Sequence, residues 1–262
     1  MKRILIKYPG LGDLIFYNSI FKHYGQNNGF RFHAVIDTAI RSSDYLDLTL
    51  ANNPYVMDIS YERSATDCRP ITRRKYETPF NAVDQLAAEL GFPTVDIISP
   101  WINYQPKILQ SFKNSVILNF DYVSYVGEID LKLFRRFIKY FISQHKSQKF
   151  ILFPSSKNQR LDEICLQTFI EMNVEYSLSD RLPLTDYIDI LASAWKSVHV
   201  TSGMASVIYA LGLKNVMLIH GEYQKSIFWR FSQYCPHENL GVRNLPSYAN
   251  YIWHKFLRIH QG

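Results

Sequence analysis

Apolar and polar positions follow two alternating patterns along this chain. Short apolar runs typical of strands cover residues 3–7, 32–36, 55–59, 94–98 and 115–120. Between them lie stretches with apolar residues at helical spacing, at residues 13–24, 81–90 and 129–143. Strands that alternate with helices are typical of parallel sheets covered on both faces. The pattern therefore predicts an α/β fold with mainly parallel sheets.

The same pattern begins again in the second half of the chain. Strands are predicted there at residues 150–153, 197–200 and 215–219, and helices at 185–194, from a glycine turn to residue 211, and at 248–259. The polar segment QHKSQK at residues 144–149 separates the two halves. We therefore place a domain boundary there, with one Rossmann-like domain at residues 1–146 and a second at residues 147–262.

Composition narrows the class of protein. With 47% hydrophobic and 20% charged residues, the chain is typical of a globular protein, and its apolar stretches are too short to span a membrane. The three cysteines are far apart and form no CxxC pair, so we expect neither a disulfide framework nor a metal site. These features predict an unexported, cytoplasmic protein. Its net charge of +6 favours anionic partners, although the basic tract at residues 69–75 is interpreted as a solvated loop.

Two glycine turns carry the chemistry that the sequence suggests. Each follows an apolar run and precedes a helical stretch, at residues 10–13 and 201–203. Such a turn presents free backbone N–H groups and the positive end of a helix dipole, which stabilise a phosphate. The first turn is not a dinucleotide fingerprint, because GxGxxG would need glycine where Ile15 stands. Asp13 is either a helix-start carboxylate or a general base at the mouth of a cleft.

The positions of other polar and aromatic residues relative to the predicted strands suggest core or ligand-binding roles. His199 lies within a predicted strand and is interpreted as a core histidine, whereas His220 follows a strand and lies at a carboxyl edge, where core and ligand-binding roles both stay open. Glu222 follows at the same edge and could hold ligand hydroxyls. Trp195 and Trp229 are interpreted as packing residues. The 18 Tyr and 17 Phe residues either fill the layers between sheet and helices or line a binding cleft.

Three segments in order along the chain resemble one protein family. They are ILIKYPGLGDLIFYNSIF at residues 4–21, NAVDQLAAELGFP at 81–93, and YIDILASAWKSVHVTSGMASVIYALGLKNVMLIHG at 187–221. Together they are similar to the bacterial heptosyltransferases of glycosyltransferase family 9, which use ADP-heptose to build the lipopolysaccharide core. The resemblance covers both halves of the chain.

The resemblance implies a GT-B fold, in which two Rossmann-like domains face a central cleft. It implies an inverting, metal-independent transfer of a sugar, such as heptose, from a nucleotide diphosphate donor to a hydroxyl of a glycan or glycolipid acceptor. The first domain would recognise the acceptor and the second the donor nucleotide. No cofactor and no nucleic acid partner are implied, and peripheral contact with the inner membrane surface stays open.

The resemblance also assigns roles to residues. Asp13 falls on the family's catalytic base, and Arg160, with Lys157 competing for the role, falls on a basic residue that would neutralise the departing diphosphate. Further donor-binding positions are Thr201, Ser202, Gly203, Met204, His220 and Glu222. The acceptor-side loop would consist of Gly10, Leu11 and Gly12.

Departures from the family pattern leave two rival interpretations. Thr201 and Ser206 stand where the family usually has Asp and His, and the chain is shorter than typical members. A degenerate transferase fold that binds a nucleotide or glycan without turnover would explain these changes. A nicotinamide-dependent oxidoreductase is disfavoured by the failed glycine fingerprint, and Asp37 would be its only candidate for ribose binding.

Overall fold

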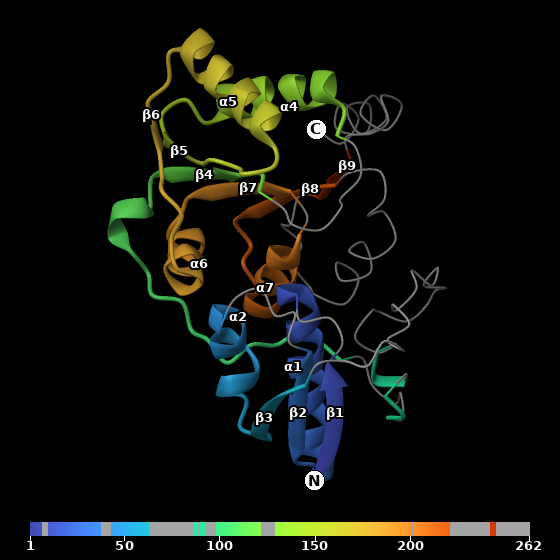
Figure 1. Cartoon of the computed structure of the whole chain (residues 1–262). Helices are drawn as coiled ribbons and strands as arrows, with labels where there is room; N and C mark the ends of the chain where they lie inside the picture. Colours follow the sequence, from blue (N-terminus) through green and yellow to red (C-terminus); the bar gives the residue numbers. More distant parts are fainter. Residues whose placement is uncertain are drawn as a thin grey trace, which may run out of the picture. The chain divides into compact units, whose positions relative to one another are not determined.

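The structure is a computed structural model of the whole chain (Figure 1). It describes residues 1–6, 10–37, 43–62, 86–88, 90–92, 98–121, 129–200, 202–220 and 242–244. These residues fall into two compact units. Unit 1 contains the described residues up to 105 together with 203–213, and unit 2 contains 106–202, 214–220 and 242–244. Both units are α/β and both sheets are parallel, as the alternating pattern predicted.

Unit 1 is built on three parallel strands in the order β1-β2-β3. Its described elements are β1 (Lys2–Ile6), α1 (Leu11–Asn28), β2 (Phe32–Asp37), α2 (Ser43–Leu48), a 3₁₀ turn (Leu50–Asn52) and β3 (Val56–Glu62). The three predicted strands are therefore confirmed. Phe21 of α1 stacks on Phe32 of β2 with ring centroids 4.4 Å apart, so aromatic residues fill the layer between helix and sheet.

Helix α1 extends one turn beyond its prediction. It ends at Gly29, whose φ of 68° is left-handed and favours glycine. The Gly29 N–H donates to the Gly25 carbonyl and the Phe30 N–H to the Tyr24 carbonyl, which satisfies the last turn of the helix. After the buried Gly25, the additional residues Gln26, Asn27 and Asn28 are polar and exposed, which is why apolar spacing did not reveal them.

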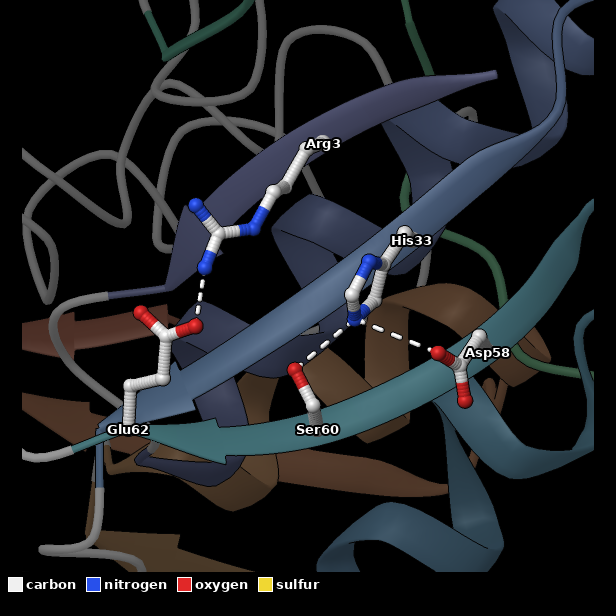
Figure 2. A network of polar contacts seen from close by, with 5 residues as sticks. All are labelled: Arg3, His33, Asp58, Ser60 and Glu62. Atoms are coloured by element: carbon white, nitrogen blue, oxygen red, sulfur yellow. Dashed lines mark hydrogen bonds and ion pairs between the residues drawn. The ribbon is translucent and has the colours of Figure 1, made fainter.

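A polar network crosses the three strands of unit 1 on one face (Figure 2). His33 Nε2 lies 2.8 Å from Ser60 Oγ and 3.3 Å from Asp58 Oδ2, while Arg3 pairs with Glu62. One ring nitrogen faces both the hydroxyl and the carboxylate, so the carboxylate does not orient the imidazole as in a Ser-His-Asp triad. The network links the strands of the sheet.

Unit 2 contains a six-stranded parallel sheet in the order β6-β5-β4-β7-β8-β9. Its strands are β4 (Ser115–Asn119), β5 (Lys149–Phe153), β6 (Tyr176–Leu178), β7 (Lys196–Val200), β8 (Val216–His220) and β9 (Val242–Asn244). Its helices are α4 (Leu131–Gln144), α5 (Gln159–Met172), α6 (Leu184–Ser193) and a 3₁₀ turn (Gln110–Phe112). Helix α7 (Gly203–Leu211) follows β7 along the chain and is part of unit 1.

Helices α4 and α5 cover one face of this sheet, and α6 lies on the other (Figure 1). The side chains buried beneath α4 and α5 include Phe120, Phe134, Phe150 and Phe169. Asp130 caps α4, because its Oδ1 accepts from the N–H groups of Lys132 and Leu133. The described cysteine, Cys165, is buried here and forms no disulfide.

The predicted domain boundary at residues 144–149 is wrong. Strand β4 pairs with β5 across this segment and also pairs with β7, so the segment is a connection within one sheet. The units divide after Gln105 instead. A polar stretch between two apolar runs marks the end of a helix as readily as the end of a domain.

Several other predictions have separate outcomes. Trp195 is 54% exposed, which contradicts its interpretation as a packing residue. The predicted strand at 94–98, the helix at 248–259, the tract at 69–75 and Trp229 lie wholly or mostly outside the described residues, as does most of the predicted helix at 81–90.

Candidate functional site

The first glycine turn places Asp13 in the first turn of α1. Gly10 precedes the helix in an extended conformation, and its carbonyl accepts from the Leu14 N–H at 2.9 Å. Leu11 is buried and Gly12 is partly buried, while Asp13 keeps part of its residue surface exposed but has its carboxyl group enclosed by protein atoms. Because β1 is parallel to its neighbour and α1 follows it, this turn lies at the carboxyl edge of the sheet, where α/β proteins bind ligands.

The carboxyl group of Asp13 has a raised pKa. Burial raises the pKa of its carboxyl from 3.8 to about 6, although the hydrogen bond from its own backbone N–H opposes the rise. Among the described residues, no ion pair holds this carboxylate. A carboxylate whose pKa lies near neutrality can accept a proton from a hydroxyl more effectively than an ordinary aspartate.

The second glycine turn begins α7, which packs against α1. A Cβ added to Gly203 would lie 3.1 Å from the Gly12 nitrogen and 3.3 Å from the Leu11 Cβ. A Cβ added to Gly12 would lie 3.3 Å from the buried Ser206 Oγ. Gly203 therefore permits close packing of two helix starts. The sequence had assigned it only to close approach of a diphosphate.

The other residues predicted to bind the donor are described to different extents. Ser202 and Met204 flank Gly203 and are partly buried. His220 is the last residue of β8, which confirms its place at a strand end, but its side chain is outside the described residues. Thr201 and Glu222 are outside them altogether, as is the side chain of Asp37.

Lys157 lies in the turn from β5 to α5, Arg160 is the second residue of α5, and both are exposed. The turn is held by Ser155, whose Oγ accepts from the Lys157 N–H at 3.2 Å and from the Asn158 N–H at 2.8 Å. The Asn158 side chain donates to the Phe120 carbonyl at the end of β4. Lys157 and Arg160 therefore stand on an ordered backbone, in the turn and in the first turn of α5.

Asp162 ties this turn to the body of α5. Its Oδ2 accepts from the Ser155 N–H at 2.6 Å, and its side chain is buried. Burial is the main cause that raises the pKa of this carboxyl to about 6, and the nearby Asp121 adds to it. Asp162 was not identified from the sequence, because one acidic residue in a first helical turn is common.

The strand order of unit 2 identifies a further part of the site that the sequence did not. From β4 the chain passes to β5 and β6 on one side, then returns to β7, β8 and β9 on the other. The order reverses between β4 and β7, and open parallel sheets bind ligands at the carboxyl ends of strands around such a point. The polar residues Asn119 and Asp121 after the apolar run of β4 were the available signal.

Asp121 is an exposed carboxylate with a defined position at this edge. Its Oδ1 accepts from Ser155 Oγ at 3.1 Å and from Ser156 Oγ at 3.4 Å, while its N–H donates to Asn119 Oδ1. Asn119 in turn donates to the Tyr187 hydroxyl at 2.8 Å. A carboxylate held by neighbouring hydroxyls can accept further hydrogen bonds from the hydroxyls of a ligand.

The prediction that His199 is a core histidine is confirmed. Its ring is buried, with Nδ1 and Nε2 lying 3.3 and 3.2 Å from the Tyr187 hydroxyl. Burial lowers the pKa of His199 to about 3 and raises that of Tyr187. His199 therefore stays neutral at physiological pH and belongs to the buried support of the strand ends.

The described residues contain neither a metal-binding cluster nor a membrane-spanning helix. No group of three or more His, Cys, Asp or Glu side chains gathers there in an arrangement that could hold a metal ion. None of the helices in this part of the chain is long and apolar enough to cross a membrane.

The fold is that of glycosyltransferases with known structures. The sequence itself matches no family model and no curated protein sequence. Solved structures, however, confirm at the level of the fold the resemblance noted in the sequence.

Three solved structures illustrate this likeness. A family 9 glycosyl transferase from Veillonella parvula superposes with a TM-score of 0.59 at 11% identity, over 98% of this chain and 89% of that one. Heptosyltransferase II of E. coli gives 0.57 at 12% identity, over 93% and 90%. The E. coli heptosyltransferase WaaC, solved with ADP, gives 0.54 at 13% identity, over 98% and 99%.

Proposed function

We propose that this chain is an inverting, metal-independent glycosyltransferase that moves a sugar from a nucleotide diphosphate donor to a hydroxyl of a bacterial glycan. The observation that carries the proposal is the buried Asp13 carboxylate at the start of α1, with a pKa raised to about 6. A binding protein has no need of such a carboxylate, whose burial costs stability at neutral pH. The fold shared with heptosyltransferases makes ADP-heptose the first donor to test.

In the proposed mechanism, Asp13 removes the proton of the acceptor hydroxyl while the hydroxyl oxygen attacks the anomeric carbon. The bond from this carbon to the diphosphate oxygen breaks on the opposite face, so the configuration at the anomeric carbon inverts. The proton stays on Asp13 until it passes to solvent. The acceptor would lie along Gly10, Leu11 and Gly12, beside the base.

Arg160 and Lys157 would bind the diphosphate and stabilise the charge that develops on it. Both are exposed cations, one in the turn before α5 and one in its first turn, and arginine can donate two parallel hydrogen bonds to phosphate oxygens. The N–H groups at Ser202, Gly203 and Met204 would add the helix dipole of α7. Cationic side chains can take the charge-neutralising role of a metal ion, so the proposal needs no metal and no cofactor.

Asp121 would accept hydrogen bonds from hydroxyls of the donor, in its ribose or its sugar. It lies at the carboxyl edge of the sheet, beside the point between β4 and β7 where the strand order reverses. Its negative charge suits hydroxyls rather than phosphates. The Ser155 and Ser156 hydroxyls hold one of its oxygens. His220 and Glu222 stay candidates for the same function.

The test begins with calorimetric titration of nucleoside diphosphates and their sugar conjugates, ADP-heptose first. We expect Arg160→Ala to weaken binding of the preferred nucleotide by at least about tenfold. Arg181→Ala removes an exposed cation elsewhere in unit 2 and should leave binding unchanged. Equal affinity of the two variants would remove Arg160 from the donor site.

Turnover is then measured as release of nucleoside diphosphate in the presence of glycan acceptors. Release that requires both donor and acceptor supports the transferase. A protein that binds nucleotide sugars tightly but releases no product with any acceptor is the degenerate binder instead.

A further inference from the structure

Strand β6 forms one edge of the sheet in unit 2 (Figure 1). It pairs with β5 on one side, and no described strand lies on its other side. The carbonyl of Glu175 and the N–H of Ser179 both bond to β5. Because backbone groups alternate in direction along a strand, the N–H and C=O groups of Tyr176 and Leu178 point away from β5. These groups therefore form a free edge of the sheet.

The side chains at this free edge are apolar and exposed. Tyr176 is 39% exposed and Leu178 is 56% exposed. The Tyr176 ring stacks on Phe169 of α5 with centroids 5.0 Å apart, so Tyr176 and Leu178 lie on the face of the sheet that α5 covers. Ile170, the residue after Phe169, is 70% exposed. Exposed apolar side chains beside free backbone groups make an edge ready to pair with a further strand.

The sequence of β6 does not protect this edge. Natural sheets often block an exposed edge with a lysine, a proline or an inward-pointing charge. Strand β6 has the sequence YSL and contains none of these residues. It has only three residues, which limits the number of hydrogen bonds that it can offer. The edge is therefore open to pairing, and the pairing is expected to be weak.

The edge is complementary to a second copy of itself. When two copies of β6 pair antiparallel about a two-fold axis at Ser177, Tyr176 of each copy lies opposite Leu178 of the other. Both residues point their backbone groups outward, so each opposed pair exchanges both of its N–H···O hydrogen bonds. The ring of Tyr176 then packs against Leu178 of the other copy, and both lose contact with water. This alignment uses every free backbone group of Tyr176 and Leu178.

The charges that flank β6 also match in this alignment. Glu175 precedes the strand, Arg181 follows it, and both are exposed. Antiparallel pairing brings the start of one strand beside the end of the other, so Glu175 of each copy approaches Arg181 of the other. Lys149 Nζ lies 3.9 Å from Glu175 Oε1, and an exposed pair at that distance is weak. The remaining charge, Asp180, falls opposite Val174 and meets no acid.

We propose that the chain associates with a second copy of itself through β6, which joins the sheets of two copies of unit 2 into one. A second copy fits better than an unrelated strand, because the edge pairs its own backbone groups, apolar side chains and flanking charges. Two short strands bury less than the roughly 1,600 Å² of a standard interface, so we expect a micromolar rather than a nanomolar dimer. The interface contains no residue proposed for sugar transfer and does not depend on that function.

Sedimentation equilibrium of the full chain, at concentrations up to about 1 mM, measures the dissociation constant of the dimer. Leu178→Pro removes an N–H that points away from β5, so the monomer keeps its own hydrogen bonds while the dimer loses donors. We expect Leu178→Pro and Leu178→Lys each to raise the dissociation constant at least about tenfold. Ile108→Lys is the matched control, because Ile108 is also 56% exposed and also in unit 2. It should leave the dissociation constant unchanged.

Charge reversal tests the alignment of the two strands. Arg181→Glu brings two acids together in the dimer and should weaken it about fivefold. Glu175→Arg/Arg181→Glu makes the two charges opposite again and should restore association. Thermal unfolding checks that each variant is folded.

Hydrogen exchange provides a second measurement on the parent alone. The Tyr176 and Leu178 amides should exchange more slowly as the protein concentration rises, because only the dimer bonds them. The Ser179 amide is the internal reference, since it donates to the Leu152 carbonyl within one chain.

Four results would overturn the proposal. The first is a parent that stays monomeric up to about 1 mM, where a micromolar dimer would be largely assembled. The second is an equal loss of association in Leu178→Lys and Ile108→Lys, which would make net charge the cause. The third is a dimer that Leu178→Pro leaves intact, since its interface must then lie elsewhere. The fourth is a double charge reversal as weak as Arg181→Glu alone, which would exclude the antiparallel alignment.

Discussion

Burying the Asp13 carboxylate is expected to have two consequences, a loss of stability at neutral pH and a base suited to catalysis. Replacing Asp13 by asparagine separates them. Asparagine keeps the size of the side chain and an oxygen that can accept from the first turn of α1, but it carries no charge and accepts no proton. In the parent protein the pKa of Asp13 is raised to about 6 by burial. Above that pH the folded state holds a carboxylate that the unfolded chain solvates better.

The size of this cost follows from the two pKa values. The difference between 3.8 in the unfolded chain and about 6 in the folded protein corresponds to about 3 kcal/mol at 1.36 kcal/mol per pH unit. The contribution of Asp13 to stability is greatest below pH 3.8, falls as the pH rises to about 6, and is constant above it. Asp13→Asn lacks this loss, so it should be the more stable protein at about pH 8, by up to about 3 kcal/mol.

Catalysis should change in the opposite direction. Removing a general base typically lowers turnover by about 10² to 10⁴, whereas the affinity for the nucleotide should barely change. The variant should therefore be more stable and less active than the parent. The two effects together distinguish a catalytic carboxylate from a residue that merely begins a helix, whose replacement lowers stability and leaves turnover alone.

The assay combines urea unfolding at about pH 4.5 and about pH 8 with sugar transfer on the same preparation. The stability advantage of Asp13→Asn should grow by about 2 kcal/mol between the two pH values. Asp44→Asn, at an exposed aspartate in the first turn of α2, is the matched control and should change neither quantity much. An advantage that is equal at both pH values would refute the burial argument, and transfer at the parent rate would refute the role as base.

Three further substitutions test other parts of the site. Gly203→Ala brings a Cβ within 3.1 Å of the α1 backbone and should lower the free energy of unfolding by about 1 to 3 kcal/mol, so unchanged urea unfolding would contradict the packing described here. Asp121→Ala should weaken donor binding about tenfold in calorimetry, while Asp180→Ala, at an exposed acid in the same unit, should not; equal affinities would exclude the proposed hydroxyl contact. Asp162→Ala leaves the Ser155 N–H unpaired, and since the pKa of Asp162 is raised to about 6, its loss should cost more stability at about pH 4.5 than at about pH 8; the reverse order in urea unfolding would contradict the raised pKa.

The sequence predicted the strands and helices of this fold better than it predicted which strands lie side by side. Strands such as β4 and β5 are short apolar runs bounded by polar residues, and burial on both faces produces that pattern directly. The same runs contain no information about which strand lies beside which, because parallel pairing joins backbones that are far apart in sequence. The order of unit 2, and with it the correct boundary, therefore required the structure. Strand β6, with three residues, was too short to be recognised.

The residues of the candidate site also fall into those that local sequence patterns identified and those that required the structure. Asp13 could be identified because a glycine turn before a helix is a local pattern. The resemblance of the chain to the glycosyltransferase family pointed to the same residue. Asp121 and Asp162 were not identified, since their significance lies in hydrogen bonds to Ser155 from two different elements. The second role of Gly203 was hidden for the same reason, because the backbone that it approaches belongs to a helix about 190 residues earlier in the chain.

The central place of β4 in the sheet of unit 2 has a consequence for expressing the chain as two fragments. A fragment of residues 147–262 would lack the strand that joins β5 to β7, and it would expose two rows of unpaired backbone groups in the middle of a sheet. Such a fragment should be insoluble alone. Residues 1–146 carry the missing strand and helix α4, so the two fragments, expressed together, are expected to reassemble as a split protein whose only missing bond lies in an exposed connection.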